Sequence, residues 1–312
     1  MQSLIKKYYS VTLKGIAMGA ADVVPGVSGG TIAFISGIYT ELINSIKSID
    51  HHAVRILFKE GFRAFWKKIN GWFLLFLFTG IGISIISLSK IILYLLHNYP
   101  TLIWSFFFGL VIASAVYIAT TIKKWNGGTI VAIIVGTAIA FFTTIASPAE
   151  GPTDLWFVFI TGLIAICAMI LPGISGSFIM LLMGMYAFIL DSLSSVKISV
   201  ILAFVAGAAT GIISFSHILS WMLRKYHDFT VAMLTGFMIG SLNKVWPWKK
   251  VLETKIVHGE EKILRESNVL PHTYTELTGL PNYLILCLVL MLVGFFVIFT
   301  LERLAGKKNQ IV

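Results

Sequence analysis

Two short segments carry the residue types that bind anions where a helix begins. Pro-Gly-Val-Ser-Gly-Gly occupies residues 25–30, and Pro-Gly-Ile-Ser-Gly-Ser occupies residues 172–177. Proline and glycine stop a helix, and the first N–H groups of the next helix lack internal partners at the positive end of its dipole. A candidate anion cradle therefore lies at each turn, formed by Ser28, Gly29, Gly30 and Thr31 and by Ser175, Gly176 and Ser177. The alternative is a helix-packing turn, because glycine and serine also let helices approach closely.

Ionisable residues also lie within the apolar stretches of the chain. An acid buried in a membrane is costly and marks a functional site by default, so Asp22 is a candidate for binding a coupling proton or cation, or for capping the turn. Glu41 is a second coupling candidate, with a solvated interfacial role as the alternative. Lys90 and His217 are candidates for neutralising a bound anion; the alternatives are a snorkelling lysine and a hydrogen-bonded core histidine. Lys244, near a predicted helix end, is expected to snorkel.

The composition places these residues in a membrane protein. Of the 312 residues, 57% are hydrophobic and only 12% are charged, about half the charged fraction of a soluble chain. Apolar runs recur at the length of about 20 residues that a helix needs to cross a bilayer. This pattern excludes a soluble enzyme, a nucleic-acid-binding protein and a disulfide-rich secreted domain. The net charge of +10 is typical of basic cytoplasmic loops, and Cys167 and Cys287 form no metal or disulfide motif.

The apolar runs predict six membrane spans and two hairpins. Each hairpin is interrupted by one Pro-Gly turn, and basic residues on both sides of the first hairpin, such as Lys14 and Lys47, predict that it makes no net crossing. Both termini are then cytoplasmic. The predicted first half, 1–150, contains a hairpin at 15–46, a basic amphipathic segment at 47–70 and spans at 71–96, 102–122 and 128–146. The predicted second half, 151–312, contains a hairpin at 155–194, spans at 198–222, 229–245 and 281–301, and an outer loop at 246–280.

The two halves are related by an internal repeat. Residues 25–39 align with residues 172–186 at an offset of 147, with seven identical positions. Each half has one hairpin and three spans, and an odd number of spans turns the second copy upside down. The predicted fold is therefore an all-α polytopic membrane protein made of two inverted repeats, each with a re-entrant helical hairpin. This plan recurs in secondary transporters, whose site lies near the midplane where the repeats meet. Hairpins whose two limbs both cross fully would give the same parity.

One stretch of the first hairpin resembles the signature of a known bacterial family. Gly15-x-x-Met-Gly-Ala-Ala-Asp-Val-Val-Pro-Gly-Val-Ser-Gly-Gly-Thr, continuing to Gly37-Ile-Tyr and Glu41, is similar to the motif of the polyprenyl-phosphate transporters, formerly catalogued as a domain of unknown function. The second Pro-Gly-Ile-Ser-Gly and the chain length extend the resemblance over nearly the whole sequence. Within the matching motif, Asp22, Pro25, Ser28, Gly29, Gly30 and Thr31 inherit candidate site roles. The second turn has Ser177 and Phe178 in place of Gly30 and Thr31.

The resemblance implies a flippase in the bacterial cytoplasmic membrane. It would return undecaprenyl phosphate from the outer to the inner leaflet, so that the lipid is recycled for cell-wall synthesis. The implied partners are this lipid and the surrounding membrane, without nucleic acid; a homodimer is compatible with the sequence. No cofactor or metal is expected, and coupling would be to H⁺ or Na⁺. A carrier or channel for a small soluble anion is the main alternative, and a lipid-phosphate enzyme lacks a recognisable catalytic motif here.

Overall fold

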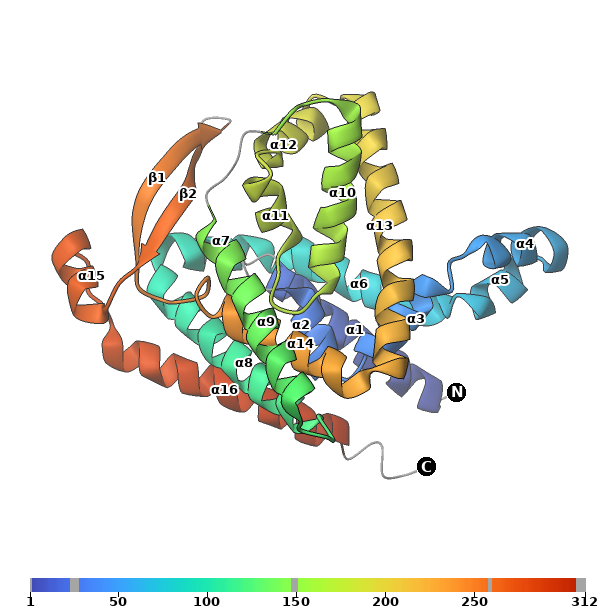
Figure 1. The fold of residues 1–312 in the computed structure, drawn as a ribbon, viewed down its shortest axis with the longest axis horizontal. Helices are drawn as coiled ribbons and strands as arrows, with labels where there is room; N and C mark the ends of the chain where they lie inside the picture. Colours follow the sequence, from blue (N-terminus) through green and yellow to red (C-terminus); the bar gives the residue numbers. More distant parts are fainter. Residues whose placement is uncertain (1, 23–27, 147–150, 258–259, 307–312) are drawn as a thin grey trace.

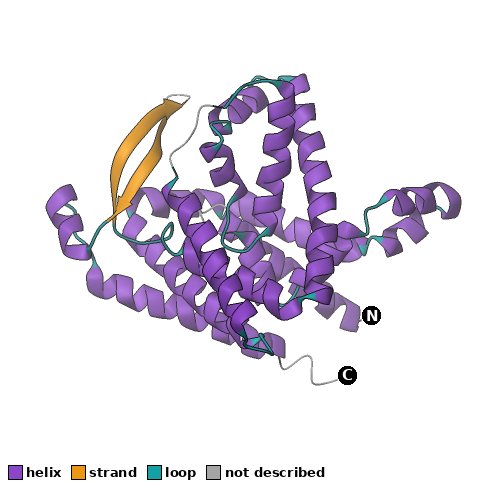
Figure 2. Ribbon diagram, in the orientation of Figure 1, coloured by secondary structure: helices purple, strands orange, loops and turns teal. Residues whose placement is uncertain are grey.

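The computed structural model describes residues 2–22, 28–146, 151–257 and 260–306, and these are mostly helical (Figure 1). Figure 2 shows that strands are confined to one antiparallel pair, which stands at the edge of the helices. The helices are α1 (Gln2–Asp22), α2 (Gly29–Ile35), α3 (Tyr39–Lys47), α4 (His51–Glu60), α5 (Phe62–Lys68), α6 (Gly71–Ser87), α7 (Ser89–Asn98), α8 (Pro100–Thr120), α9 (Gly127–Ile145), α10 (Leu155–Ile170), α11 (Gly176–Leu182), α12 (Tyr186–Ser194), α13 (Ile198–Lys225), α14 (His227–Ser241), α15 (Pro271–Thr278) and α16 (Leu284–Gly306), and the strands are β1 (Lys249–Val257) and β2 (Glu260–Asn268).

Several helices are long and apolar enough to cross a membrane. Within the described residues α8, α9 and α13 meet this criterion alone, and the number rises to five if the bent pairs α5–α6 and α11–α12 are each one span. Shorter apolar helices are α10 and residues 284–298 of α16. A multi-pass membrane protein follows from these lengths, because a helix rises about 1.5 Å per residue and the hydrocarbon layer is about 30 Å thick.

Three predicted spans differ from the observed helices. The span predicted at 71–96 is divided at Leu88, where α6 ends and α7 begins. The span predicted at 229–245 corresponds to α14, which has only 15 residues, and the span predicted at 281–301 corresponds to α16, which runs from Leu284 to Gly306. The first limb of the predicted hairpin at 15–46 also starts earlier, because α1 has 21 residues and runs from Gln2.

The prediction of an all-α fold is wrong for the segment that follows α14. Strands β1 and β2 pair antiparallel, with Lys249 opposite Asn268 and Val257 opposite Glu260, and the register shifts around Glu253. The segment predicted as an outer loop therefore contains a β-hairpin followed by α15. The β-branched residues in Val251-Leu-Glu-Thr-Lys-Ile-Val are the local signal for β1.

The boundaries of the hairpin helices repeat at the sequence offset of 147. Helices α2 and α3 correspond residue for residue to α11 and α12. Each pair is separated by a glycine with a left-handed backbone, Gly37 at φ +71° and Gly184 at φ +70°, a conformation that side chains with a Cβ rarely adopt. Ser28 and Ser175 take the same extended conformation at the starts of α2 and α11. From Ser28 and from Ser175 onward, the two segments thus have the same backbone structure.

Four helix pairs form the framework around these hairpins: α1 with α6, α10 with α13, α8 with α16, and α9 with α14. Figure 1 shows α10 and α13 side by side, with α11 and α12 next to them in the upper part of the view. Small residues allow the close contacts, because without a Cβ the two backbones can approach. At the crossing of α1 and α6, a Cβ on Gly80 would lie 2.9 Å from the backbone nitrogen of Ile16 and 3.0 Å from the Cα of Gly15.

The α1–α6 crossing yields a stability prediction. Gly80→Val is expected to destabilise the protein by about 1–3 kcal/mol, because the added atoms meet backbone that has no room to move. The measurement is the thermal unfolding midpoint in detergent. Gly82→Val on the same helix is the matched control, since a Cβ there meets nothing within 4 Å. Equal midpoints for the two variants would contradict the packing at this crossing.

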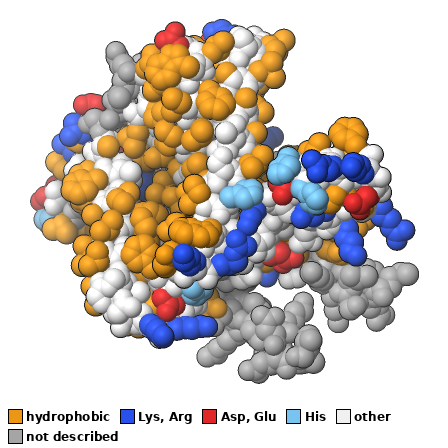
Figure 3. All heavy atoms as spheres, turned by 45° about the vertical axis from the view of Figure 1, so that its right-hand side comes forward, with side chains coloured by type: hydrophobic (Ala, Val, Ile, Leu, Met, Phe, Trp, Pro, Cys, Tyr) orange, Lys and Arg blue, Asp and Glu red, His pale blue; other side chains and the backbone are white. Residues whose placement is uncertain are grey.

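The basic segment predicted at 47–70 forms two short helices rather than one. Helices α4 and α5 meet at Gly61, whose φ of +86° breaks the helix, and they project from the framework (Figure 1). Figure 3 shows lysine, arginine and histidine side chains gathered on this projection. Such a surface is typical of contact with anionic lipid headgroups.

Candidate functional site

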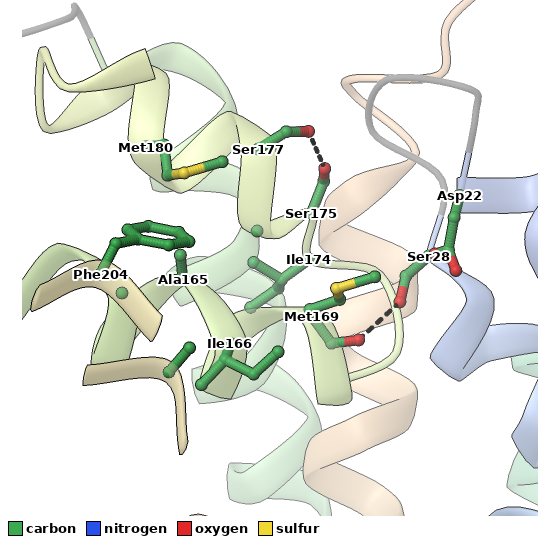
Figure 4. Close-up of a pocket in the computed structure, with 13 residues that line it drawn as sticks. Asp22, Ser28, Ala165, Ile166, Met169, Ile174, Ser175, Ser177, Met180 and Phe204 are labelled. Atoms are coloured by element: carbon green, nitrogen blue, oxygen red, sulfur yellow. Dashed lines mark hydrogen bonds between the residues drawn. The ribbon is translucent and has the colours of Figure 1, made fainter. Parts of the chain in front are cut away.

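A cavity of about 270 Å³ is lined mainly by the second hairpin and α13, and the first hairpin closes one end of it (Figure 4). Its polar groups come from the ends and starts of helices, where α1 contributes Asp22 and the two turns contribute Ser28, Ser175 and Ser177. The remaining wall is made of apolar side chains and glycines on α10, α11, α13 and the turn between α10 and α11: Gly162, Ala165, Ile166, Met169, Ile174, Gly176, Met180, Phe204 and Ala208. The cavity therefore has a polar end against the first hairpin and an apolar body within the second half of the chain.

The N–H groups of the first turn are engaged by side chains of the same turn. The N–H of Gly29 donates to Asp22 Oδ1 with an N···O distance of 2.6 Å. The N–H of Gly30 donates to Ser28 Oγ at 3.1 Å, so Ser28 caps α2. An internal carboxylate thus takes the position that a bound anion would take at a helix start.

Asp22 is held close against the turn. A Cβ on Gly29 would lie 2.5 Å from Asp22 Oδ2 and 2.8 Å from Oδ1, so glycine is required for this approach. The carboxylate is half-buried and lines the cavity. It can therefore act both as a cap of α2 and as a group that takes up a proton or cation from the cavity.

The first hairpin is tied to the turn of the second by hydrogen bonds between residues more than 130 positions apart. The hydroxyl of Ser28 donates to the carbonyl oxygens of Met169 and Leu171, at 3.2 and 3.3 Å. The N–H of Gly173 donates to Thr31 Oγ1 at 3.1 Å. The phenol of Tyr39 donates to the carbonyl oxygen of Ile170 at 3.1 Å. Ser28 and Thr31 thus join the hairpins and are buried, and only Ser28 also lines the cavity.

The second turn leaves its polar groups more open. Ser175 makes no side-chain cap of α11. Its hydroxyl lies 2.9 Å from the hydroxyl of Ser177, an exposed pair in which either oxygen is able to donate. Both hydroxyls line the cavity (Figure 4). The two turns share a backbone shape, but their hydroxyl groups differ in role: those of the first join the hairpins, and those of the second face the cavity.

The structure brings together the predicted residues of both turns and Asp22, but it separates them from the other candidates. Among the described residues, the cavity lining does not include Glu41, Lys90 or His217. Glu41 accepts a hydrogen bond from the Asn70 amide at 3.0 Å, which joins α3 to the start of α6. Lys90 is exposed on α7, and His217 Nδ1 lies 2.8 Å from the carbonyl oxygen of Ile213 within α13. Pro25 lies outside the described residues.

The apolar wall of the cavity was not predicted from the sequence. Ile166, Met180 and Phe204 have no polar atom to single them out within long apolar runs. One signal did exist, because Met169 occupies the repeat position of Asp22, and both residues line the cavity. The two copies of the motif thus supply an acid from one half and a thioether from the other.

The sequence model of the VCA0040-like family, described as undecaprenyl phosphate translocase-like, matches residues 18–263. The chain belongs to this family. The matched range contains both turns and every residue that lines the cavity.

Two curated relatives of this translocase-like family are similar over nearly their whole length. A polyprenyl-phosphate transporter of Vibrio cholerae is 46% identical over 301 residues, covering 96% of this chain and 98% of the relative. A polyprenyl-phosphate transporter of Staphylococcus aureus is 31% identical over 320 residues, covering 95% and 97%. No solved structure matches the chain. The family membership predicted from the motif around Asp22 is therefore confirmed.

Proposed function

We propose that this protein is a translocase that carries undecaprenyl phosphate from the outer to the inner leaflet of the bacterial cytoplasmic membrane, for recycling in cell-wall synthesis. Both termini are cytoplasmic in this proposal. The cavity that both hairpins line is the observation that carries it, because a polar end and an apolar body suit a phosphate headgroup joined to a prenyl chain. The names of the two bacterial relatives support the same substrate class.

The phosphate binds at the polar end in this proposal. Ser175 and Ser177 supply hydroxyl groups, and the first turn supplies the N–H of Gly29 when Asp22 releases it. A charged Asp22 repels a phosphate bound beside it, because both groups are anions. The two groups also compete for the N–H of Gly29. Protonation of Asp22, or pairing with Na⁺, removes the repulsion and frees the N–H. Binding of the coupling ion and binding of the lipid are thereby linked at one carboxylate.

The mechanism is alternating access by two inverted repeats with re-entrant hairpins. The different packing of the two hairpins supports it. Helices α2 and α3 contact α1, α6 and α8 of their own half and also α10 and α13 of the other half, whereas the main contacts of α11 and α12 are with α10 and α13 of their own half. One repeated motif thus occupies two environments. In the proposed transport step, each hairpin adopts the packing that the other hairpin has in this structure. This exchange turns the cavity toward the opposite leaflet, as in other transporters built from inverted repeats.

The test uses purified protein in liposomes that carry undecaprenyl phosphate in both leaflets. An impermeant enzyme that modifies the phosphate reports how much lipid becomes reachable from outside over time. We expect protein-dependent exchange that changes with an imposed pH or sodium gradient. Excess inorganic phosphate inside the vesicles is not expected to leave them.

Three results would change this proposal. Lipid exchange equal to that of protein-free vesicles under every gradient would overturn it. Release of inorganic phosphate without lipid exchange would assign the cavity to a soluble anion. Net movement toward the leaflet corresponding to the outer face, with the gradient of a living cell, would reverse the proposed direction.

A further inference from the structure

A group of charged side chains outside the cavity lies where the β-hairpin meets the helices. Lys244 follows α14, Lys249 begins β1 and Glu266 lies in β2. The Nζ atoms of Lys244 and Lys249 are 3.2 and 3.4 Å from the same oxygen, Glu266 Oε2. Two ammonium groups therefore share one carboxylate, and this Lys244–Glu266–Lys249 cluster has an excess positive charge. Lys244, which was expected to snorkel, pairs with Glu266 in this cluster.

Lys249 is a buried cation whose donors are not satisfied by the protein. Only 7% of its side chain is exposed, and Nζ makes no hydrogen bond of acceptable geometry with any described residue. Its other close contact is the ring of Trp104, whose centroid is 3.9 Å from Nζ. A cation over an aromatic face recovers part of the lost hydration, but the N–H groups still lack acceptors.

The electrostatics of the cluster are consistent with this geometry. Burial lowers the pKa of Lys249 to about 8, while Glu266 opposes the shift. Burial would raise the pKa of Glu266, but Lys249 and Lys244 together hold it below its ordinary value. Two lysines face one carboxylate in this cluster, so its excess of positive charge attracts an anion.

The cluster adjoins the second hairpin. Lys244 Nζ lies 4.8 Å from the ring centroid of Phe178, the residue that follows Ser177 in α11. Because Ser177 lines the cavity, the first turn of α11 separates the cluster from the cavity. An anion bound at the cluster would therefore be one helical turn from the polar end of the site.

We infer that Lys244 and Lys249 form a second binding site, for a phosphate monoester, in which the ligand displaces the carboxylate of Glu266. The inference rests on the proposed function, since the lipid headgroup is such a phosphate. A phosphate carries a charge of about −1.5 to −2 and three acceptor oxygens, so it satisfies both lysines better than one carboxylate oxygen does. Trp104 and Phe178 give the site an aromatic border against which the first isoprene unit packs.

The alternative role of the cluster is a strut that holds the β-hairpin to the helices. The two roles predict opposite effects for Glu266→Gln. If the cluster is a binding site, the substitution raises the affinity for phosphate, because the competing charge is removed and the lysines are freed. If the cluster is a strut, the substitution lowers the stability of the protein, because two ion pairs are broken, and it leaves the affinity for phosphate unchanged.

The experiment measures binding of farnesyl phosphate, farnesol and inorganic phosphate to the full-length protein in lipid nanodiscs. We expect Lys249→Met to weaken farnesyl phosphate binding by about tenfold or more, because a charge-assisted hydrogen bond is lost. Glu266→Gln is expected to strengthen binding by about threefold or more. Lys250→Met is the matched control, since Lys250 is the next residue of β1 and is exposed; its affinity should equal that of the wild type.

Each result bears on the inference. Unchanged affinity in both Lys249→Met and Glu266→Gln would overturn it, and a lowered unfolding midpoint would then assign the strut. If Lys249→Met does not fold, the inference is tested by whether Lys244→Met weakens and Glu266→Gln strengthens the binding of farnesyl phosphate. Lysine-dependent binding of farnesyl phosphate alone identifies a lipid headgroup site, and equal binding of inorganic phosphate identifies a site for phosphate itself. Lysine-dependent binding without lipid exchange in liposomes would refute the proposed function and leave this site standing.

Discussion

Asp22→Asn is expected to reduce the movement of undecaprenyl phosphate to the level of protein-free vesicles while the protein remains folded. Asparagine keeps an oxygen that can accept the N–H of Gly29 at the position of Oδ1, so the turn stays capped. It cannot take up a proton or provide a negative charge for Na⁺, so the link between coupling ion and phosphate is lost. The measurement is lipid exchange in liposomes under an imposed gradient, beside the thermal unfolding midpoint.

Two further variants separate the roles of Asp22. Asp22→Ala removes the acceptor as well as the charge, so it should also lower the unfolding midpoint, by an amount that corresponds to about 0.5–2 kcal/mol for a lost cap. Asp191→Asn on α12 is the control for removing an acid, because Asp191 pairs with Lys197 at an exposed position. Full exchange by Asp22→Asn would show that the carboxylate is only a structural cap.

The double variant Ser175→Ala, Ser177→Ala is expected to lower lipid exchange by about a hundredfold or more without changing stability. The hydroxyl groups lie 2.9 Å apart at an exposed position and face the cavity, so their loss leaves no buried group unsatisfied. The phosphate loses two hydrogen bonds to charged oxygens, each contributing about 1.5–3 kcal/mol. Exchange rates and unfolding midpoints measured on the same preparations test this prediction.

Ser28→Ala is the matched comparison in the first turn. In contrast to the double variant, it is expected to lower the stability of the protein. It removes the donor to the carbonyl oxygens of Met169 and Leu171 and the cap of Gly30. The unfolding midpoint should fall by the equivalent of about 1–3 kcal/mol. If the double variant at the second turn were fully active, or if it were destabilised as much as Ser28→Ala, the division of roles between the turns would be wrong.

The sequence was sufficient for features that depend on neighbouring residues. The apolar runs required a membrane, because so few charged residues cannot cover a soluble surface. The Pro-Gly-x-Ser-Gly segments located the starts of α2 and α11, and their offset predicted an internal repeat, with which the bounds of α2–α3 and α11–α12 agree. The motif around Asp22 also identified the family. Each of these signals is contained in a short stretch of chain, where glycine, proline and helix caps act over a few residues.

Tertiary structure alone decided which groups meet. Glu41, Lys90 and His217 are suitable residue types in suitable spans, yet packing directs them to Asn70, to the surface and to their own helix. The surroundings of Lys249 show the same limit, because they combine Glu266 of the paired strand with Trp104 of the distant helix α8.

The reason is that a polar group in a low-dielectric interior takes whichever partner the packing brings within about 3 Å. Ser28 illustrates this: its cap of Gly30 follows from residues two positions apart, whereas its bonds to Met169 and Leu171 span 141 and 143 positions. The sequence by itself determined the membrane class, the turns, their repetition and the family. The cavity and the cation cluster beside it exist only because the helix pairs pack in this arrangement, which sets distances that no local pattern encodes.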